Sequence, residues 1–379
     1  MSKIAIVASI DFLALLNDTS RSLGGTASVI KNIIYHLSHE RIVCFGVTDN
    51  KKLINKEIVI DSRISIYSFI LLPKSRRFPK RIAVFLKGIY INKALSKFDI
   101  DSVYSHCVEI SFWISKKYWV VEHMHGAENA VARSTFSILQ INIFKSMWSF
   151  IREKSIKKCN KIVAIDAKCL MLAAKHKKPE DILSIPNFVD ENLFYFDRCG
   201  TNYIKTDKKI ILFVGRIEAV KGLDLFIDIV ADLNSESHDW LGVIVGSGSV
   251  LGQLKKYATE SNCHDSVCFL GPIYDTHTLR KIYSQADTFL LTSHYEGVPM
   301  CVLEALACGT PVVATDVGGV SALSDETDTI CKTVKSRNKK EFSRSIRLVS
   351  GKRQKIEPNT FSLGVKKKVG LISSLLSSP

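Results

Sequence analysis

Two groups of residues in the second half of the chain have types and spacing suited to binding a phosphorylated ligand. The first follows an apolar run at 210–214, where Gly215 and Arg216 precede Lys221 and Gly222. A strand that ends in glycine and leads into a helix places cationic side chains beside backbone N–H groups, which suits a diphosphate. The alternative is that Arg216 and Lys221 flank an ordinary solvated loop.

The second group contains two carboxylates, Glu296 and Glu304, separated by seven residues. A helix is expected to begin near Pro299, so Glu304 lies roughly two turns into it. Carboxylates so placed can accept hydrogen bonds from hydroxyls at two ends of one ligand, while helix N–H groups between them face an anion. A nucleotide sugar has this distribution of groups. For Glu296 alone, interaction with the helix dipole is the simpler interpretation.

Short β-branched runs alternate with helix-length amphipathic segments in both halves, a pattern typical of parallel sheets covered on both faces. A polar stretch at 175–208 separates the halves. We therefore expect an α/β protein with two Rossmann-like, doubly wound domains, 1–185 and 186–360, facing each other across a cleft. Strands are expected at 3–8, 42–47, 102–105, 119–123, 161–165, 210–214, 241–245, 267–270, 288–291 and 311–314.

The order of Arg216 and Lys221-Gly222, then Glu296 and Glu304, then the segment 309–314 resembles the donor-binding half of glycosyltransferase family 4. This family contains retaining, nucleotide-sugar-dependent enzymes of the GT-B fold. The resemblance is dense from about residue 185 to 320. It implies that the first domain binds the acceptor, that the second binds the donor, and that a last helix at 361–379 crosses back to the first domain.

The resemblance also implies roles at matching positions. Arg216 and Lys221 would hold the donor diphosphate as it leaves. Glu304 would bind the ribose hydroxyls, and Glu296 would contact the transferred sugar. Further donor-binding positions are implied mainly through their backbone, namely Gly24, Gly25, Gly215, Gly246, Gly297, Val298, Pro299, Met300 and Cys301.

The first half resembles the family less closely. His125, followed by Gly126, matches the position expected beside the transferred sugar, with His123 as an alternative on the same strand. For Gly24 and Gly25, an ordinary helix start is the alternative. With His125 we expect a catalytic set that also contains Arg216, Lys221 and Glu296. One departure is that the family usually continues with Pro-Glu after the glycine pair at 318–319, whereas this chain continues with Val-Ser.

We expect a metal-independent hexosyltransferase that moves a sugar from a nucleoside-diphosphate sugar, with UDP favoured, to a lipid-linked or lipopolysaccharide-type acceptor in bacterial surface polysaccharide synthesis. No other cofactor is expected. Asp99 and Asp101 match the Asp-x-Asp motif of metal-dependent transferases, but they precede a strand, so we interpret them as its start. The alternatives are a GT-B sugar-nucleotide epimerase or phosphorylase, and a non-catalytic nucleotide-sugar-binding or nucleic-acid-binding protein.

Composition excludes a disordered or disulfide-scaffold protein, because the 379 residues are 46% hydrophobic and 23% charged. The net charge of +15 lies mainly in the first half, where residues 71–98 contain eight basic and no acidic side chains. Residues 144, 147, 148 and 151 form an apolar stripe that favours either core packing or docking on anionic lipid. No apolar run is long enough to span a bilayer, and no Cys-x-x-Cys pair occurs. We expect a cytoplasmic protein, peripheral on the inner face of the cytoplasmic membrane, with no nucleic acid partner.

Overall fold

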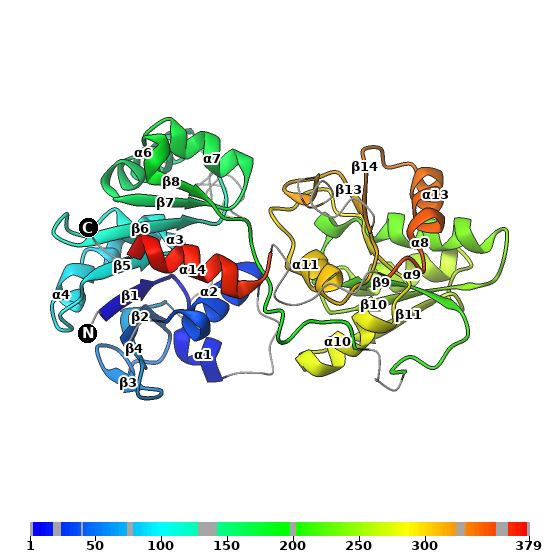
Figure 1. Ribbon diagram of the computed structural model, residues 1–379, viewed down its shortest axis with the longest axis horizontal. Helices are drawn as coiled ribbons and strands as arrows, with labels where there is room; N and C mark the ends of the chain where they lie inside the picture. Colours follow the sequence, from blue (N-terminus) through cyan, green and yellow to red (C-terminus); the bar gives the residue numbers. More distant parts are fainter. Residues whose placement is uncertain are drawn as a thin grey trace. The chain divides into compact units, whose positions relative to one another are not determined.

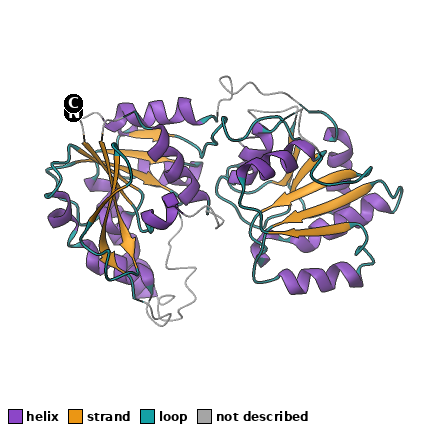
Figure 2. Cartoon of the chain, turned by 90° about the horizontal axis from the view of Figure 1, so that it is seen from below, coloured by secondary structure: helices purple, strands orange, loops and turns teal. Residues whose placement is uncertain are grey.

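The computed structural model describes residues 3–17, 24–38, 41–73, 79–127, 142–197, 202–321, 323, 330–353 and 363–376. The chain divides into two compact units, which we treat separately. The N-terminal unit consists of Met1–Asp18, Thr26–Pro186 and Lys368–Pro379, and the C-terminal unit of Thr19–Gly25 and Asn187–Lys367. In each unit, helices flank the strands of one sheet (Figures 1 and 2). No helix of the described segments is long and apolar enough to cross a membrane.

The N-terminal unit contains an eight-stranded sheet in the order β3-β4-β2-β1-β5-β6-β7-β8. Its neighbouring strands are parallel except for the antiparallel pair β3–β4. The strands are β1 (Lys3–Val7), β2 (Arg41–Thr48), β3 (Glu57–Val59), β4 (Ile64–Leu71), β5 (Ser102–Ser105), β6 (Trp119–Met124), β7 (Lys161–Ala164) and β8 (Ile182–Ser184). The helices are α1 (Phe12–Asn17), α2 (Gly25–His36), α3 (Lys80–Gly88), α4 (Ile91–Leu95), α5 (Val108–Ser111), α6 (Asn142–Lys158), α7 (Ala167–Ala174) and most of α14 (Val365–Leu376).

The C-terminal unit contains a six-stranded, fully parallel sheet in the order β11-β10-β9-β12-β13-β14. Its strands are β9 (Lys209–Val214), β10 (Trp240–Val245), β11 (Val267–Gly271), β12 (Thr288–Leu291), β13 (Val312–Thr315) and β14 (Cys331–Val334). Its helices are α8 (Leu223–Asn234), α9 (Leu251–Glu260), α10 (Thr276–Gln285), α11 (Met300–Ala307) and α13 (Lys339–Val349). Central strands are buried on both faces, as their continuous apolar sequences predict.

Every strand expected from the sequence is present within a residue or two of its predicted ends. The expectation of two α/β domains with parallel sheets is therefore confirmed. Four strands, β3, β4, β8 and β14, were not expected. The expected polar linker at 175–208 contains β8, which pairs with β7 and extends the first sheet.

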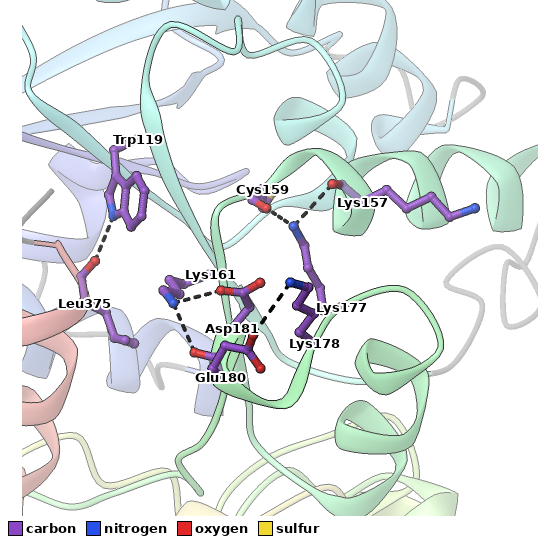
Figure 3. Close-up of polar contacts among 9 residues, drawn as sticks. All are labelled: Trp119, Lys157, Cys159, Lys161, Lys177, Lys178, Glu180, Asp181 and Leu375. Carbon is purple, nitrogen blue, oxygen red and sulfur yellow. Dashed lines mark hydrogen bonds and ion pairs between the residues drawn. The ribbon is translucent and has the colours of Figure 1, made fainter. Parts of the chain in front are cut away.

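The last helix is anchored on the N-terminal unit. The indole N–H of Trp119 in β6 donates a hydrogen bond of 2.9 Å to the carbonyl of Leu375 in α14 (Figure 3). Nearby, Lys161 at the start of β7 forms an ion pair of 2.8 Å with Asp181, and Lys177 donates to the Cys159 carbonyl. These contacts tie α14 and the β7–β8 edge to the same sheet. The ends of the helix predicted at 361–379 lie outside the described residues.

Candidate functional site

Two loops of the C-terminal unit are joined at the carboxyl ends of neighbouring strands. One follows β9 and includes a short 3-10 helix at Ala219–Lys221, and the other follows β12, which pairs with β9. The backbone N–H of His294 donates to the carbonyl of Val220 over 2.8 Å, and the Thr292 hydroxyl donates to the carbonyl of Lys221 over 3.1 Å. These bonds hold the two loops together at the carboxyl ends of parallel strands, which is where α/β proteins bind ligands.

An ion pair connects these loops. Lys221 Nζ lies 2.6 Å from Glu296 Oε1, and the two side chains are only 15% and 10% exposed. The Ser293 hydroxyl donates to the same carboxylate oxygen over 2.6 Å. Partial burial strengthens the attraction between charges. The structure therefore brings together two of the residues predicted from sequence to act on one ligand.

The loop containing Glu296 continues through Gly297, Val298 and Pro299 into α11, which begins at Met300. N–H groups in the first turn of a helix have no partner four residues earlier, and the helix dipole makes this end positive. The N–H of Met300 and that of Cys301 occupy this turn. Together with Lys221, they supply the positive potential that an anionic group requires.

Glu304 is the fifth residue of α11, so it lies about one turn into the helix and not two as expected, and it is half-buried. Its Oε2 accepts a hydrogen bond of 2.8 Å from the hydroxyl of Tyr283 in α10. Burial raises the pKa of Glu304 to about 7, and the hydrogen bond from Tyr283 partly opposes this shift. A carboxylate in this state is a strong acceptor for a ligand hydroxyl, because such a bond would offset part of its desolvation.

Two predicted glycines meet at the carboxyl ends of β9 and β10. Gly246 has a φ of +143°, and a Cβ added there would lie 1.9 Å from the carbonyl oxygen of Gly215. Only glycine fits so close an approach. Neither residue therefore covers the backbone with a side chain at the carboxyl ends of these two strands, next to the loop that contains Lys221.

Arg216 follows Gly215 directly and is exposed. In the part of the chain that the structure describes, its side chain forms no hydrogen bond or ion pair. Unlike Lys221, Arg216 is thus not joined to Glu296, and its guanidinium is available to an anion.

Sequence reasoning missed two supports of the loop at 296–298. Asn187 is buried and donates from Nδ2 to the Val298 carbonyl over 2.7 Å. Gly318 lies against the same loop, since a Cβ there would be 2.2 Å from the Glu296 carbonyl oxygen. The N–H of Gly319 donates to the carbonyl of Gly297 over 2.7 Å. The glycine pair itself was the available signal, although only the departure after it was considered.

The histidines expected in the first half lie at the carboxyl end of the N-terminal sheet. His123 is buried in β6, whereas His125 follows the strand and is half-buried. Burial lowers the pKa of His125 to about 4 and holds the pKa of His123 well below its usual value. His125 is thus the more accessible of the two candidates, and its imidazole is neutral at pH 7.

The two glycines predicted in the first half lie at the start of a helix. Gly24 precedes α2, and Gly25 begins it. The carboxylate of Asp101 accepts a hydrogen bond of 2.8 Å from the backbone N–H of Lys3, which agrees with a role at the start of β5.

The two units, each built on a parallel sheet, have the GT-B fold. Solved structures of glycosyltransferases have the same fold. WaaG, a glycosyltransferase involved in lipopolysaccharide biosynthesis, has a TM-score of 0.70 at 14% identity and covers 99% of this chain and 100% of that one. HepE from Anabaena in complex with UDP has a TM-score of 0.65 at 15% identity, covering 99% and 95%.

Sequence similarity points to glycosyltransferases. Residues 201–360 match the family described as glycosyl transferases group 1. D-inositol 3-phosphate glycosyltransferase from Geodermatophilus obscurus is 28% identical over 279 residues, or 69% of this chain and 60% of that protein. The chain thus spans less than two thirds of that relative's length. The family match lies within the C-terminal unit and includes Lys221, Glu296 and Glu304.

Proposed function

We propose that this protein is a retaining glycosyltransferase of family 4 that transfers a hexose from a nucleoside-diphosphate sugar. The observation that carries the proposal is the Lys221–Glu296 ion pair, 2.6 Å long, beside the N-terminal turn of α11. A cation, a helix N-terminus and a carboxylate in one place match a diphosphate linked to a sugar. Glu304, further along α11, matches the ribose of the same donor.

In the proposed reaction, an acceptor hydroxyl oxygen forms a bond to the anomeric carbon while the bond from that carbon to the diphosphate oxygen breaks. Arg216, Lys221 and the N–H groups of Met300 and Cys301 stabilise the charge that develops on the departing diphosphate. The acceptor proton passes to the leaving phosphate oxygen on the same face of the sugar, which retains the anomeric configuration. Glu296 accepts a hydrogen bond from a sugar hydroxyl. The role of His125 at the transferred sugar stays a prediction from the family resemblance.

We propose that the donor is a UDP-sugar, so that its base is uracil. We also propose that transfer does not require a metal. The UDP complex of HepE, which shares the fold, supports the choice of base. Two side-chain cations and a helix N-terminus already provide positive charge for the diphosphate, which supports metal independence.

We propose a lipid-linked or lipopolysaccharide-type acceptor at the inner face of a bacterial cytoplasmic membrane. The observation that favours it is a surface of the N-terminal unit, the α3–α6 patch. Trp148 and Ile151 of the expected stripe are buried against α3, whereas other apolar side chains beside them are exposed. The exposed apolar members of the patch are Leu86, Ile89, Tyr90, Ile143, Met147 and Phe150, and exposed basic residues around them are Lys80, Arg81, Lys154 and Lys157. Exposed apolar and basic residues together suit an anionic membrane surface.

The proposal is tested by incubating the protein with UDP-sugars and measuring UDP release and the anomeric configuration of the product by NMR. We expect turnover with at least one UDP-hexose, with retention, and a rate lower by about 100-fold or more in Lys221→Ala. Interconversion of the UDP-sugar without UDP release would favour an epimerase. Binding of UDP without release or interconversion would favour a non-catalytic protein.

A further inference from the structure

Three histidines that are distant in sequence lie together at the carboxyl end of the N-terminal sheet. His106 follows β5, His123 lies in β6 and His125 follows β6, and these strands are paired. The centroids of the His123 and His125 rings are 4.4 Å apart, and His106 lies 5.0 Å from each. One ring nitrogen of each residue lies within 4.8 Å of the other two.

The hydrogen bonds of this cluster leave two buried nitrogens without a partner among the described residues. His123 Nδ1 is bonded to the Tyr104 hydroxyl over 2.7 Å, and His106 Nδ1 to His125 Nε2 over 2.7 Å. The second ring nitrogens of His106 and His123 are both buried, and no described residue forms a hydrogen bond with either of them. Buried polar atoms without a partner are costly and rare. Two such atoms in one cluster indicate a ligand that the described residues do not supply.

We propose that His106, His123 and His125 form a binding site for one divalent transition-metal ion of the zinc type. Neutral imidazole is the form that binds metals, and burial keeps these rings neutral. Three histidines and an open fourth position are a known zinc arrangement. Imidazole suits zinc, copper and nickel, whereas magnesium and calcium prefer oxygen ligands.

The ring nitrogens of the three histidines are not spaced as the nitrogen ligands of a bound zinc ion are. Ligand nitrogens of tetrahedral zinc are about 3.3 Å apart, which follows from Zn–N distances of about 2.0–2.1 Å. The three ligand nitrogens lie within 4.8 Å of one another, so the side chains must rotate to bring them to this spacing. The bound ion would replace the hydrogen bond between His106 and His125. If His123 Nδ1–H donates to Tyr104, the lone pair of Nε2 faces the ion, so Tyr104 would orient this ligand.

The site does not depend on the proposed transfer reaction, although both involve His125. Its test therefore measures metal binding directly. The full-length protein is treated with a chelator, dialysed, and titrated with Co²⁺, whose visible absorption reports ligand type and geometry. We expect one equivalent of cobalt to bind with tetrahedral bands and no thiolate charge-transfer band, and Zn²⁺ to displace it. An excess of Mg²⁺ or Ca²⁺ should leave the spectrum unchanged.

Metal binding by substituted proteins tests which residues hold the ion. His106→Ala and His125→Ala are each expected to weaken binding at least tenfold, and Tyr104→Phe about tenfold or more through loss of the orienting bond. His264→Ala is the matched control, because this exposed histidine lies beside Cys263 in the other unit, and binding should not change. Circular dichroism verifies folding, and the half-buried position of His125 makes its variant the safest. Absence of the cobalt spectrum, or unchanged binding in both His106→Ala and His125→Ala, would overturn the proposal.

Discussion

Lys221 and Glu296 are 75 residues apart, yet Lys221 Nζ lies 2.6 Å from Glu296 Oε1. Each residue belongs to a loop that follows one of two paired strands, β9 and β12. The pair links the two sequence motifs that were recognised separately. It also means that Lys221 is held in place before any ligand arrives, so its charge needs little reorganisation to act on a diphosphate.

The ion pair should stabilise the C-terminal unit. We predict that a double-mutant cycle with Lys221→Met and Glu296→Gln gives a coupling free energy of roughly 1–2 kcal/mol, because both side chains are largely buried. Urea unfolding measures it. The exposed pair Lys256–Glu260 is the control and should give about 0.5 kcal/mol or less. Equal coupling in the two pairs would show that partial burial adds nothing.

Glu304 should make stability depend on pH. Its pKa is about 7 in the folded protein and about 4.5 when unfolded, so the folded state holds its proton more tightly. The contribution of Glu304 to stability is then fully present below pH 4.5 and is lost as the pH rises through about 7. We predict that Glu304→Gln removes roughly 1–3 kcal/mol of this fall, less than the full shift implies because the residue is half-buried. Denaturation midpoints at pH 5 and pH 8 measure it, with exposed Glu260→Gln as the control. Parallel pH dependence in wild type and Glu304→Gln would contradict the assignment.

Asn187 should act through the loop that it holds. Asn187→Ala removes the bond to the Val298 carbonyl and should cost about 1–2 kcal/mol of stability. We also predict a UDP affinity lower by about tenfold, measured by calorimetry, because the backbone of the loop at 297–301 loses its support. Asn192→Ala, a neighbouring change outside this contact, is the control. Unchanged UDP affinity in a destabilised Asn187→Ala protein would limit Asn187 to a structural role.

The α3–α6 patch should govern membrane association. Vesicles containing anionic lipid should carry wild-type protein upward in flotation, whereas purely zwitterionic vesicles should not. The triple variant Ile143→Ser, Met147→Ser and Phe150→Ser should lose most of this binding, since all three side chains are exposed. Leu348→Ser, an equally exposed apolar change in the C-terminal unit, should bind as wild type does. Flotation that is the same with both vesicle types would remove the anionic-lipid proposal.

Much of the fold could be predicted because buried parallel strands have continuous apolar sequences. β4 was missed for a physical reason, since Ser65 and Ser68 interrupt its apolar run although both are buried. β14 was missed because it is an edge strand, and Lys332 and Thr333 within it are only half-buried. Edge strands need not be apolar on both faces.

The candidate site was predictable as a set of residue types but not as contacts. Glu304 was placed correctly on a helix, yet its bond from Tyr283 depends on how α10 packs against α11. Asn187 reaches Val298 across 111 residues of sequence, and no local pattern specifies such a contact. The histidine cluster likewise arises from the pairing of β5 with β6, which brings His106 to His125.

Nucleotide binding tests the central claim most directly. Thermal unfolding would be followed with UDP, GDP, ADP, CMP and NAD, with and without Mg²⁺, for wild type and Lys221→Ala. We predict that UDP raises the midpoint, because a ligand at about 100 times its Kd stabilises the native state by about 2.7 kcal/mol. The shift should not depend on Mg²⁺ and should disappear in Lys221→Ala. No shift with any nucleoside diphosphate, or the same shift in wild type and Lys221→Ala, would contradict the assignment of this site.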